Sequence, residues 1–200
     1  VRSKYGLTEK DFVMLGVGQV QTRKGILDFV EVAKSCPDFQ FIWAGGFSFG
    51  RITDGYDALS EVVENPPKNV KFLGIIDRSE MNEIYNMADV MFLPSYSELF
   101  PMTVLEAMNV GIPMLLRELE LYENILFDYY LRANDNDTFS NIIKKLSSDA
   151  SYYKNWALQS QKGSDFYCRD SVGKMWEEYY AQMLELESSD HYAKKSKAYY

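Results

Sequence analysis

The chain has 200 residues, of which 46% are hydrophobic and 15% aromatic, enough to bury the core of one domain with an appended tail. Its 21 basic and 29 acidic residues give a formal net charge of -8, which argues against a nucleic acid or an anionic membrane surface as the main ligand of this segment. No apolar run approaches the ~18 residues of a membrane span, so we expect a soluble globular domain.

The start of the sequence and its cysteines bear on the setting of the chain. It begins at Val1 with neither an initiator Met nor a signal peptide, which indicates a segment of a longer chain. Cys36 and Cys168 are far apart without metal-ligand spacing around them, so we interpret both as buried, reduced thiols. The expected location is the cytoplasm, or the cytoplasmic face of the membrane if the rest of the protein docks there.

Up to residue 116, apolar runs alternate with helical patterns. Phe12 to Gly18 is a continuous apolar run typical of a strand buried on both faces, and Lys24 to Ala33 has helical spacing. The same signals predict helices at residues 56–63 and 79–88, and strands at residues 39–46, 69–74, 90–94 and 111–116. This alternation predicts an α/β fold with a parallel sheet, helices on both faces, and ligands beyond the carboxyl ends of the strands.

The remainder of the chain is mainly helical in pattern. We expect a short sixth strand at residues 128–131 and helices at residues 139–146, 152–161 and 172–186. Asp137 or Thr138 is placed to cap the first of these helices. From Ser188 onward the sequence is polar with a lysine cluster, which predicts a solvated tail.

Residues 95–108 combine two carboxylates with a predicted helix start. Pro101 suits the first helical turn, and Val104 and Met108 recur at helical spacing as a buried face. Glu98 then lies in the loop, while Glu106 lies on the helix with its side chain leaning back toward the N-terminus. Both acids can face one place, where the free N–H groups of the first turn can seat a phosphate. The stretch therefore predicts a sugar-nucleotide site, with amides for the diphosphate and carboxylates for ribose and hexose hydroxyls.

The loop of residues 18–25 is a second candidate for ligand binding. Glycines let the backbone approach a ligand, and Arg23 and Lys24 at a helix start can grip a diphosphate. The spacing departs from the dinucleotide fingerprint, and Ala44-Gly45-Gly46 stands where a ribose-binding acid would follow the second strand, which disfavours NAD. Lys24 also precedes its glycine, so the loop is not a Walker A motif. Taken alone, the loop could be a solvated basic turn.

Other features have simpler explanations than function. Glu106 taken alone could be a solvated helix residue. His191 is the only histidine and lies in the polar tail, so no serine-type triad or histidine metal site can be built. Asp135 and Asp137 lie in a polar turn, where helix capping explains them better than a metal bound to a diphosphate. An aromatic stripe is more typical of helix packing than of ligand binding: Trp176, Tyr179, Tyr180 and Met183.

Several segments together resemble a known family. They are Gly18 to Gly25 with Lys24, Ala44-Gly45-Gly46, Phe72-Leu73-Gly74, residues 89–95, and Glu98 to Glu106 followed by Gly111-Ile112-Pro113. They resemble the C-terminal, donor-binding half of the GT-B retaining glycosyltransferases, family 4, group 1, whose sheet is Rossmann-like. The likeness covers nearly the whole chain. It implies a nucleotide-sugar-binding domain at residues 1–187, a polar tail at 188–200, and an acceptor-binding N-terminal domain outside this chain.

The resemblance also implies roles for individual residues. Glu98 matches the first Glu of the family motif, which contacts hexose hydroxyls and is often given a part in catalysis, and Lys24 matches the catalytic, diphosphate-gripping lysine. Glu106 would hold the ribose, and Ile76 would lie where backbone groups read the base, usually uracil. The other donor-binding positions are Gly18, Arg23, Leu99, Phe100, Pro101, Met102 and Thr103. The family commonly has Arg in place of Gln19, so Arg23 or the other domain must compensate, or the leaving group is stabilised less.

A narrower resemblance is to the diacylglycerol glycosyltransferases of Gram-positive bacteria, which make glycolipid anchors of lipoteichoic acid. It is carried by residues 18–25, 94–101 and 116–122. We therefore expect a retaining, metal-independent hexosyltransferase without a cofactor, which uses a UDP-hexose and a lipid or saccharide acceptor bound by the other domain. In this family the last helix crosses back to the N-terminal domain. The segment alone should bind UDP and transfer no sugar. The alternatives are a non-catalytic nucleotide-binding module and an NAD-dependent oxidoreductase.

Overall fold

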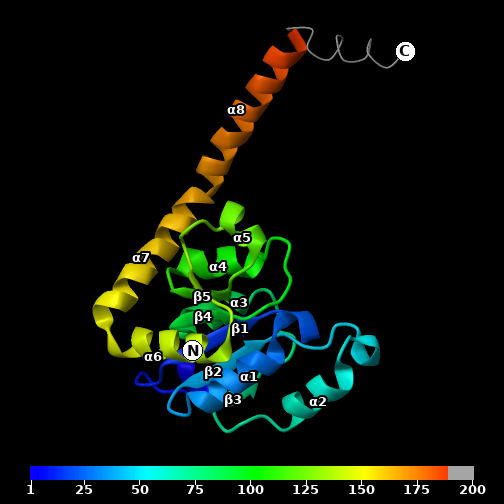
Figure 1. The fold of residues 1–200 in the computed structure, drawn as a ribbon, viewed down its shortest axis with the longest axis vertical. Helices are drawn as coiled ribbons and strands as arrows, with labels where there is room; N and C mark the ends of the chain where they lie inside the picture. The colour runs from blue at the N-terminus through cyan, green and yellow to red at the C-terminus, as the bar shows by residue number, and fades with distance from the viewer. Residues whose placement is uncertain (189–200) are drawn as a thin grey trace. The chain divides into compact units, whose positions relative to one another are not determined.

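The computed structural model describes residues 1–188, and a six-stranded sheet with helices on both sides forms its centre (Figure 1). The strand order is β3-β2-β1-β4-β5-β6, and the neighbouring strands pair in parallel. The strands are β1 (Val13–Val17), β2 (Gln40–Ala44), β3 (Val70–Phe72), β4 (Val90–Leu93), β5 (Met114–Arg117) and β6 (Leu131–Ala133). This arrangement confirms the expected α/β fold with a Rossmann-like parallel sheet.

The helices cover both faces of this sheet. They are α1 (Ile26–Ser35), α2 (Tyr56–Glu64), α3 (Met81–Met87), α4 (Met102–Val110), α5 (Glu120–Ile125) and α6 (Asn136–Ser148). The chain runs from β1 outward to β3 through α1 and α2, and from β3 back across to β5 through α3 and α4. Because such crossovers are right-handed, the two pairs of helices lie on opposite faces.

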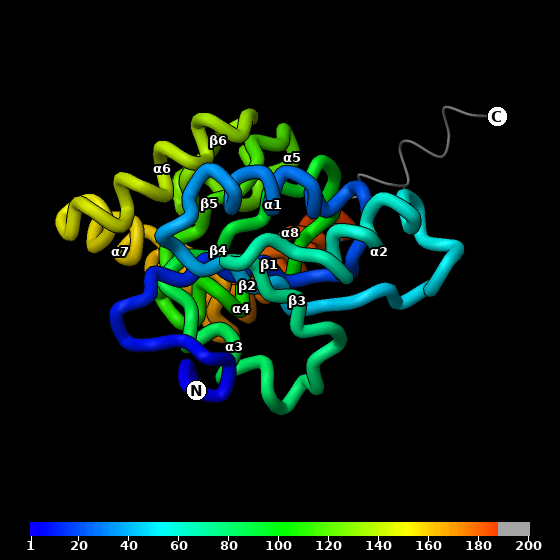
Figure 2. Tube along the Cα trace, turned by 90° about the horizontal axis from the view of Figure 1, so that it is seen from below, coloured from blue at the N-terminus to red at the C-terminus, as the bar shows by residue number. Residues whose placement is uncertain are grey.

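Short 3-10 turns complete the framework: η1 (Arg2–Tyr5), η2 (Thr22–Lys24) and η3 (Gly50–Ile52). The N-terminal turn η1 lies beside α3 (Figure 2). Arg2 fixes it there, since its Nε donates to the carbonyl oxygen of Met87 at 3.0 Å and its Nη2 pairs with Asp89 at 2.9 Å. The first residues of the chain are therefore part of the folded unit.

The core between α1, α6 and the sheet is aromatic. Phe29 of α1 packs edge-on against Trp43 at 5.1 Å between ring centroids and stacks on Phe92 at 5.4 Å. Gly16 in β1 leaves room for the indole, because a Cβ there would lie 2.2 Å from Cε3 of Trp43. Each aromatic pair stabilises the core by about 0.5–1.5 kcal/mol beyond its buried area. This core supports the carboxyl ends of β1, β2 and β4.

Some local expectations were wrong. Strand β6 begins at Leu131, where the predicted sixth strand was to end, and α5 was not predicted at all. Helix α6 is capped by Asp135, whose Oδ1 accepts from the Thr138 N–H at 2.8 Å, and not by Asp137 or Thr138. Pro101 is the residue just before α4, in an extended conformation, so the helix begins at Met102.

The two cysteines differ. Cys36 is buried and reduced, as expected, and burial raises the pKa of its thiol. Cys168 is also free but exposed, which contradicts the expectation that it is buried. It lies immediately before the helix α8 (Arg169–Ser188), where a side chain has little apolar packing around it.

The chain divides into two compact units, residues 1–163 and a second that begins at Ser164. Helix α7 (Ala150–Phe166) contains the division, and α8 belongs to the second unit. Within α8, Trp176 stacks on Tyr180 with centroids 5.7 Å apart, and both rings remain about half exposed. No helix within residues 1–188 combines the length and apolar character needed to cross a membrane. His191 and the tail predicted as solvated lie outside the described residues.

Candidate functional site

The candidate site lies where the strand order reverses. β1 and β4 are central neighbours whose following helices lead to opposite edges of the sheet, and the loops after such strands form a crevice for ligands. Here these are the loops of residues 18–25 and 94–101. The Tyr96 N–H donates to the carbonyl oxygen of Arg23 at 2.8 Å. Gly25 has a φ of +69°, and a Cβ on it would lie 2.3 Å from the Pro94 carbonyl oxygen, so only glycine permits this approach.

Lys24 and Glu98, the two residues predicted to be catalytic, form an ion pair between these loops. The Lys24 Nζ donates to Oε1 of Glu98 at 2.6 Å, and their side chains are only 11% and 5% exposed. Arg23 lies on the other side, with Nη1 3.5 Å from Oε2 of Glu98. Two cations therefore share one carboxylate. Arg23 and Glu98 line a pocket of about 320 Å³ together with Ser97, Leu99 and Phe100.

A network of hydrogen bonds around Asp28, which no local sequence pattern predicts, includes Tyr96 of the same loop as Glu98. Asp28 of α1 accepts hydrogen bonds from Arg117 of β5 and from the Tyr96 hydroxyl. The same guanidinium lies 4.1 Å from the centre of the Tyr96 ring and donates to the carbonyl oxygens of Pro94 at 3.0 Å and Asn134 at 2.8 Å. The hydrogen bond to Asp28 raises the pKa of the Tyr96 phenol. The network holds the loop that carries Glu98 against α1 and β5.

A second pocket, of about 190 Å³, lies at the ends of β1 and β2 and contains the predicted base-reading segment. Its lining includes Gly18, Gln19, Gly46, Ile75 and Ile76. Gln19 accepts a hydrogen bond from Gln21, so a neutral amide stands where the family commonly has Arg.

The glycines of this second pocket bring two strand ends into contact. The indole N–H of Trp43 donates to the carbonyl oxygen of Gly18 at 2.9 Å. A Cβ on Gly45, whose φ is +140°, would lie 1.8 Å from the same oxygen. The glycine pair after β2 therefore allows close packing beneath the loop of residues 18–25.

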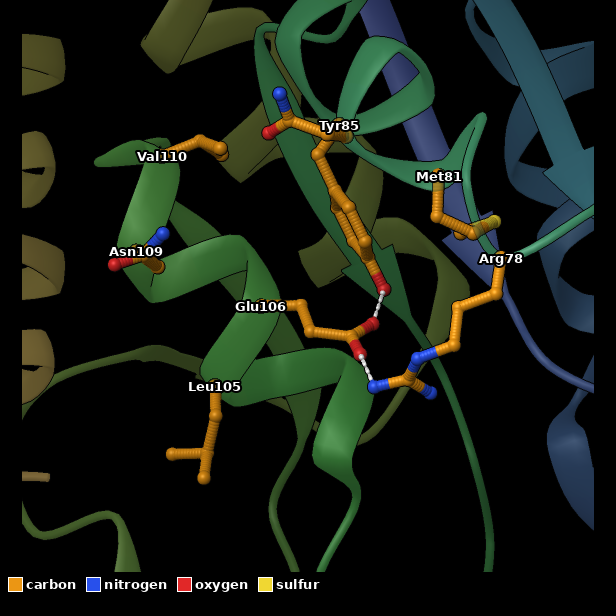
Figure 3. A pocket seen from close by; sticks show the side chains of 8 residues that line it. Arg78, Met81, Tyr85, Leu105, Glu106, Asn109 and Val110 are labelled. Atoms are coloured by element: carbon orange, nitrogen blue, oxygen red, sulfur yellow. Dashed lines mark hydrogen bonds and ion pairs between the residues drawn. The ribbon is translucent and has the colours of Figure 1, made fainter. Parts of the chain in front are cut away.

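Glu106 lines a third pocket, of about 320 Å³, between α3 and α4 (Figure 3). The Tyr85 hydroxyl donates to its Oε2 at 2.6 Å, and Nη2 of Arg78 lies 3.8 Å from Oε1. Burial, followed by the hydrogen bond to Glu106, raises the pKa of Tyr85 well above its ordinary value, so the phenol stays protonated. Met81 lines both this pocket and the one that contains Ile76, so the two pockets adjoin.

The remaining predicted residues form the start of α4. Leu99 and Met102 are largely exposed, and Pro101 precedes the helix. The Thr103 hydroxyl is buried and has no hydrogen-bond partner within the described part of the chain. The N–H groups in the first turn of any helix lack partners within the helix, so this end can receive an anion.

The structure groups the predicted residues without bringing them all together. Lys24, Arg23 and Glu98 are joined, whereas Glu106 lines a different pocket from Glu98. Sequence reasoning missed Tyr85. Its hydroxyl binds Glu106 on a different helix, 21 positions away, and no local pattern links the two residues. Hydrophobic periodicity predicts that a tyrosine is buried but not where its hydroxyl points.

Asp135 and Asp137 do not form a metal site in this structure. Oδ1 and Oδ2 of Asp135 accept from the backbone N–H and the hydroxyl of Thr138, each at 2.8 Å, so Asp135 caps α6, a role that we had expected of Asp137 or Thr138. No group of three or more His, Cys, Asp or Glu residues suited to a metal ion is present among residues 1–188.

Comparison with known proteins places this geometry in context. The model of the family described as glycosyl transferases group 1 matches residues 1–163. The alpha-galactosylglucosyldiacylglycerol synthase of Streptococcus pneumoniae is 40% identical over 186 residues, which are 93% of this chain and 50% of that protein. The processive diacylglycerol alpha-glucosyltransferase of Acholeplasma laidlawii is 34% identical over 147 residues, covering 72% of this chain and 43% of that protein. The chain thus spans about half the length of these relatives.

A similar fold occurs among solved structures. Anabaena Alr3699/HepE in complex with UDP and glucose superimposes with a TM-score of 0.77 at 20% identity, over 90% of this chain and 50% of that one. At this level of identity the likeness is evidence for the fold alone.

Proposed function

The chain belongs to the group 1 glycosyl transferases, and on this premise we propose that it is the donor-binding half of a hexosyltransferase that uses a UDP-hexose. The observation that carries the proposal is the buried Lys24–Glu98 pair, 2.6 Å long, at the switch point of the sheet. The Lys24 ammonium can exchange its hydrogen bond to Glu98 for one to a diphosphate. The released carboxylate can then accept hydrogen bonds from sugar hydroxyls. The solved relative that holds UDP and glucose supports this choice of donor.

In the proposed mechanism, each pocket holds one part of the donor. The base lies against Ile76 and the loop at Gly18, the ribose contacts Glu106, and Lys24 with the first-turn amides of α4 faces the diphosphate. These positive groups stabilise the charge that develops on the leaving diphosphate. Glu98 holds the hexose while the acceptor hydroxyl attacks the anomeric carbon from the side on which the diphosphate leaves. The bond from that carbon to the diphosphate oxygen breaks, the hydroxyl proton passes to the departing diphosphate, and the anomeric configuration is retained.

The same positive groups can replace a metal ion, so we propose a metal-independent reaction. Lys24 and Arg23 lie within 4 Å of the Glu98 carboxylate and provide two charges beside the diphosphate. Arg23 can also supply the positive charge that the family commonly has at the position of Gln19, where this chain has a neutral amide. The names of the relatives favour a glycolipid or diacylglycerol acceptor. We propose that the acceptor is bound outside this segment, by the N-terminal domain of the full-length enzyme, and that α8 reaches that domain. We further propose that this enzyme acts in the cytoplasm, at the membrane surface.

Calorimetric titration with UDP and UDP-glucose, in the presence of EDTA, tests the proposal. We expect the wild-type chain to bind both ligands, because the proposed contacts to the diphosphate need no metal ion. Lys24→Met and Glu106→Ala should each weaken UDP binding by about 10- to 100-fold, since each removes a charge-assisted contact. Lys34→Met and Glu31→Ala, which break an exposed ion pair on α1, are matched controls and should change nothing. Absence of UDP binding, or unchanged binding in both site variants, would refute the donor site, and loss of binding in EDTA would refute metal independence.

A further inference from the structure

Glu106 stands on α4 with a side chain that is 34% exposed. A glutamate with this exposure ordinarily samples several rotamers, and fixing one of them has an entropic cost. A carboxylate that must meet a ribose diol binds more tightly if its orientation is set before the ligand arrives. The surroundings of Glu106 supply such an orientation.

Tyr85 fixes the orientation of the Glu106 carboxylate. The ring extends from α3 and is 3% exposed, and the hydroxyl donates to Oε2 of Glu106 at 2.6 Å. This length is typical of a hydrogen bond from a hydroxyl to a carboxylate. Because burial raises the pKa of Tyr85, the phenol remains a donor throughout the neutral pH range.

The second oxygen of Glu106 is in a different environment. Oε1 faces Arg78, whose Nη2 lies 3.8 Å away, too far for a hydrogen bond. The Arg78 side chain is 92% exposed, and an ion pair of this kind contributes little and is easily displaced. Figure 3 shows the three side chains converging on one side of the pocket, with Tyr85 and Arg78 approaching different oxygens of the carboxylate.

We propose that Tyr85 is a positioning residue for ribose recognition: its hydroxyl holds Oε2 of Glu106 and thereby directs Oε1 toward the ribose hydroxyls of the donor. The inference rests on the proposed function. Tyr85 itself does not touch the nucleotide. Its contribution passes entirely through Glu106, so it should appear only for ligands that carry the hydroxyls that Glu106 binds.

That restriction gives a decisive experiment. UDP and 2′,3′-dideoxy-UDP are titrated into the wild-type chain and into Tyr85→Phe. We expect Tyr85→Phe to weaken UDP binding by about five- to tenfold and to leave the affinity for dideoxy-UDP unchanged. In the Glu106→Ala background, Tyr85→Phe should cause no further loss for either nucleotide. If Tyr85 had a purely structural role, Tyr85→Phe would instead lower the affinity for both nucleotides by the same factor.

Tyr153→Phe is the matched control. It also removes one hydroxyl from a tyrosine, in this case a partly buried one, which donates to the Asp89 carbonyl oxygen at 3.0 Å and lines none of the three pockets described above. Both nucleotides should bind this variant as they bind the wild type. Thermal melting of each variant shows whether it is folded, and the Glu106→Ala cycle gives an independent measure of the coupling.

The possible failures can be told apart. Suppose that the wild-type chain binds UDP. If Tyr85→Phe lowers the affinity for both nucleotides by the same factor, or lowers neither, the positioning role is overturned while the donor site stands. If the wild-type chain does not bind UDP, the proposed function fails and this inference fails with it. Equal losses from Tyr85→Phe with and without Glu106 would also overturn the inference.

Discussion

Lys24 and Glu98 neutralise one another at a point where their side chains have little access to solvent. Pairing of this kind avoids leaving an isolated buried charge, which would be far more costly. In the proposed mechanism, a diphosphate competes with Glu98 for the ammonium. The carboxylate therefore holds the lysine in place before the donor binds, and its removal should affect stability and affinity in opposite directions.

Glu98→Gln tests this competition. The amide has nearly the shape of the carboxylate but no charge, so the buried Lys24 loses its counterion and the free energy of unfolding should fall by about 1–3 kcal/mol. The freed lysine should bind UDP several-fold more tightly than in the wild type. Affinity for UDP-glucose should rise less than affinity for UDP, because the hexose loses its charged acceptor. Urea unfolding and calorimetry measure the two effects.

The control for this variant is Glu80→Gln. Glu80 also pairs with a lysine, Lys4, at 2.6 Å, but both side chains are about half exposed. Exposed pairs contribute at most about 1 kcal/mol. Glu80 precedes Met81, which lines two of the pockets, but neither Lys4 nor Glu80 itself lines any of the three. The variant should leave UDP binding unchanged. Weaker UDP binding by Glu98→Gln would show that Glu98 does not compete for the lysine.

At the scale of elements, one buried ion pair ties α1, β5 and the loop after β4 together. Asp28 belongs to α1 and Arg117 to β5, and both contact the loop of residues 94–101 through Tyr96 and Pro94. The side chains of Asp28 and Arg117 are 18% and 9% exposed. Removing one partner leaves the other charge buried, whereas removing both leaves a gap that apolar groups can fill.

We predict that Arg117→Met lowers the free energy of unfolding by about 3–5 kcal/mol, as expected when one member of a buried pair is lost. The double variant Asp28→Leu/Arg117→Met should recover most of that loss. Urea denaturation of the single and double variants, followed by circular dichroism, measures the coupling between them. The single variant Asp28→Leu completes the cycle, and additive losses would show that the pair does not link these elements.

The success of prediction for each element follows from its length and periodicity. β1 and β4 were predicted within a residue or two because they are continuous apolar runs between clear boundaries. Helix α5 has six residues, too few for an apolar face to repeat, and it was missed. β6 was misplaced because the aromatic residues just before it suggested a strand, although Tyr130 is a buried residue of the preceding turn.

The candidate site divides in the same way. Lys24 and Glu98 could be proposed from sequence because each lies between a predicted strand and the helix that follows it. Asp28, Tyr85 and Arg117 could not, because their partners are separated from them by 21 to 89 positions and no local pattern encodes such contacts. Local sequence patterns thus predict the groups proposed to face the donor, while the contacts of Asp28, Tyr85 and Arg117 depend on tertiary structure.

At the scale of the whole molecule, the three pockets are built from residues between Val17 and Val110, all within the first compact unit. The sheet and its covering helices end with α6 and α7. The donor site therefore does not draw on any residue of α8.

A chain of residues 1–166, which keeps α7 complete, should therefore bind UDP with the affinity of the 200-residue chain. Calorimetry on both chains measures this, and circular dichroism establishes that the shorter chain is folded. The variant Lys24→Met in the shorter chain should weaken UDP binding by the same factor as in the longer one. A folded 1–166 chain that fails to bind UDP would show that the second unit contributes to the site.

The glycines of β1 and β2 constrain how this sequence can change over evolution. A side chain at position 16 would collide with the Trp43 ring, and one at position 45 would collide with the Gly18 carbonyl oxygen that the same indole holds. Accepting a larger residue at position 16 would require prior loss of the indole, which would release the loop above it. Trp43 must therefore change before Gly16 can. A lineage that keeps Trp43 is expected to keep both Gly16 and Gly45.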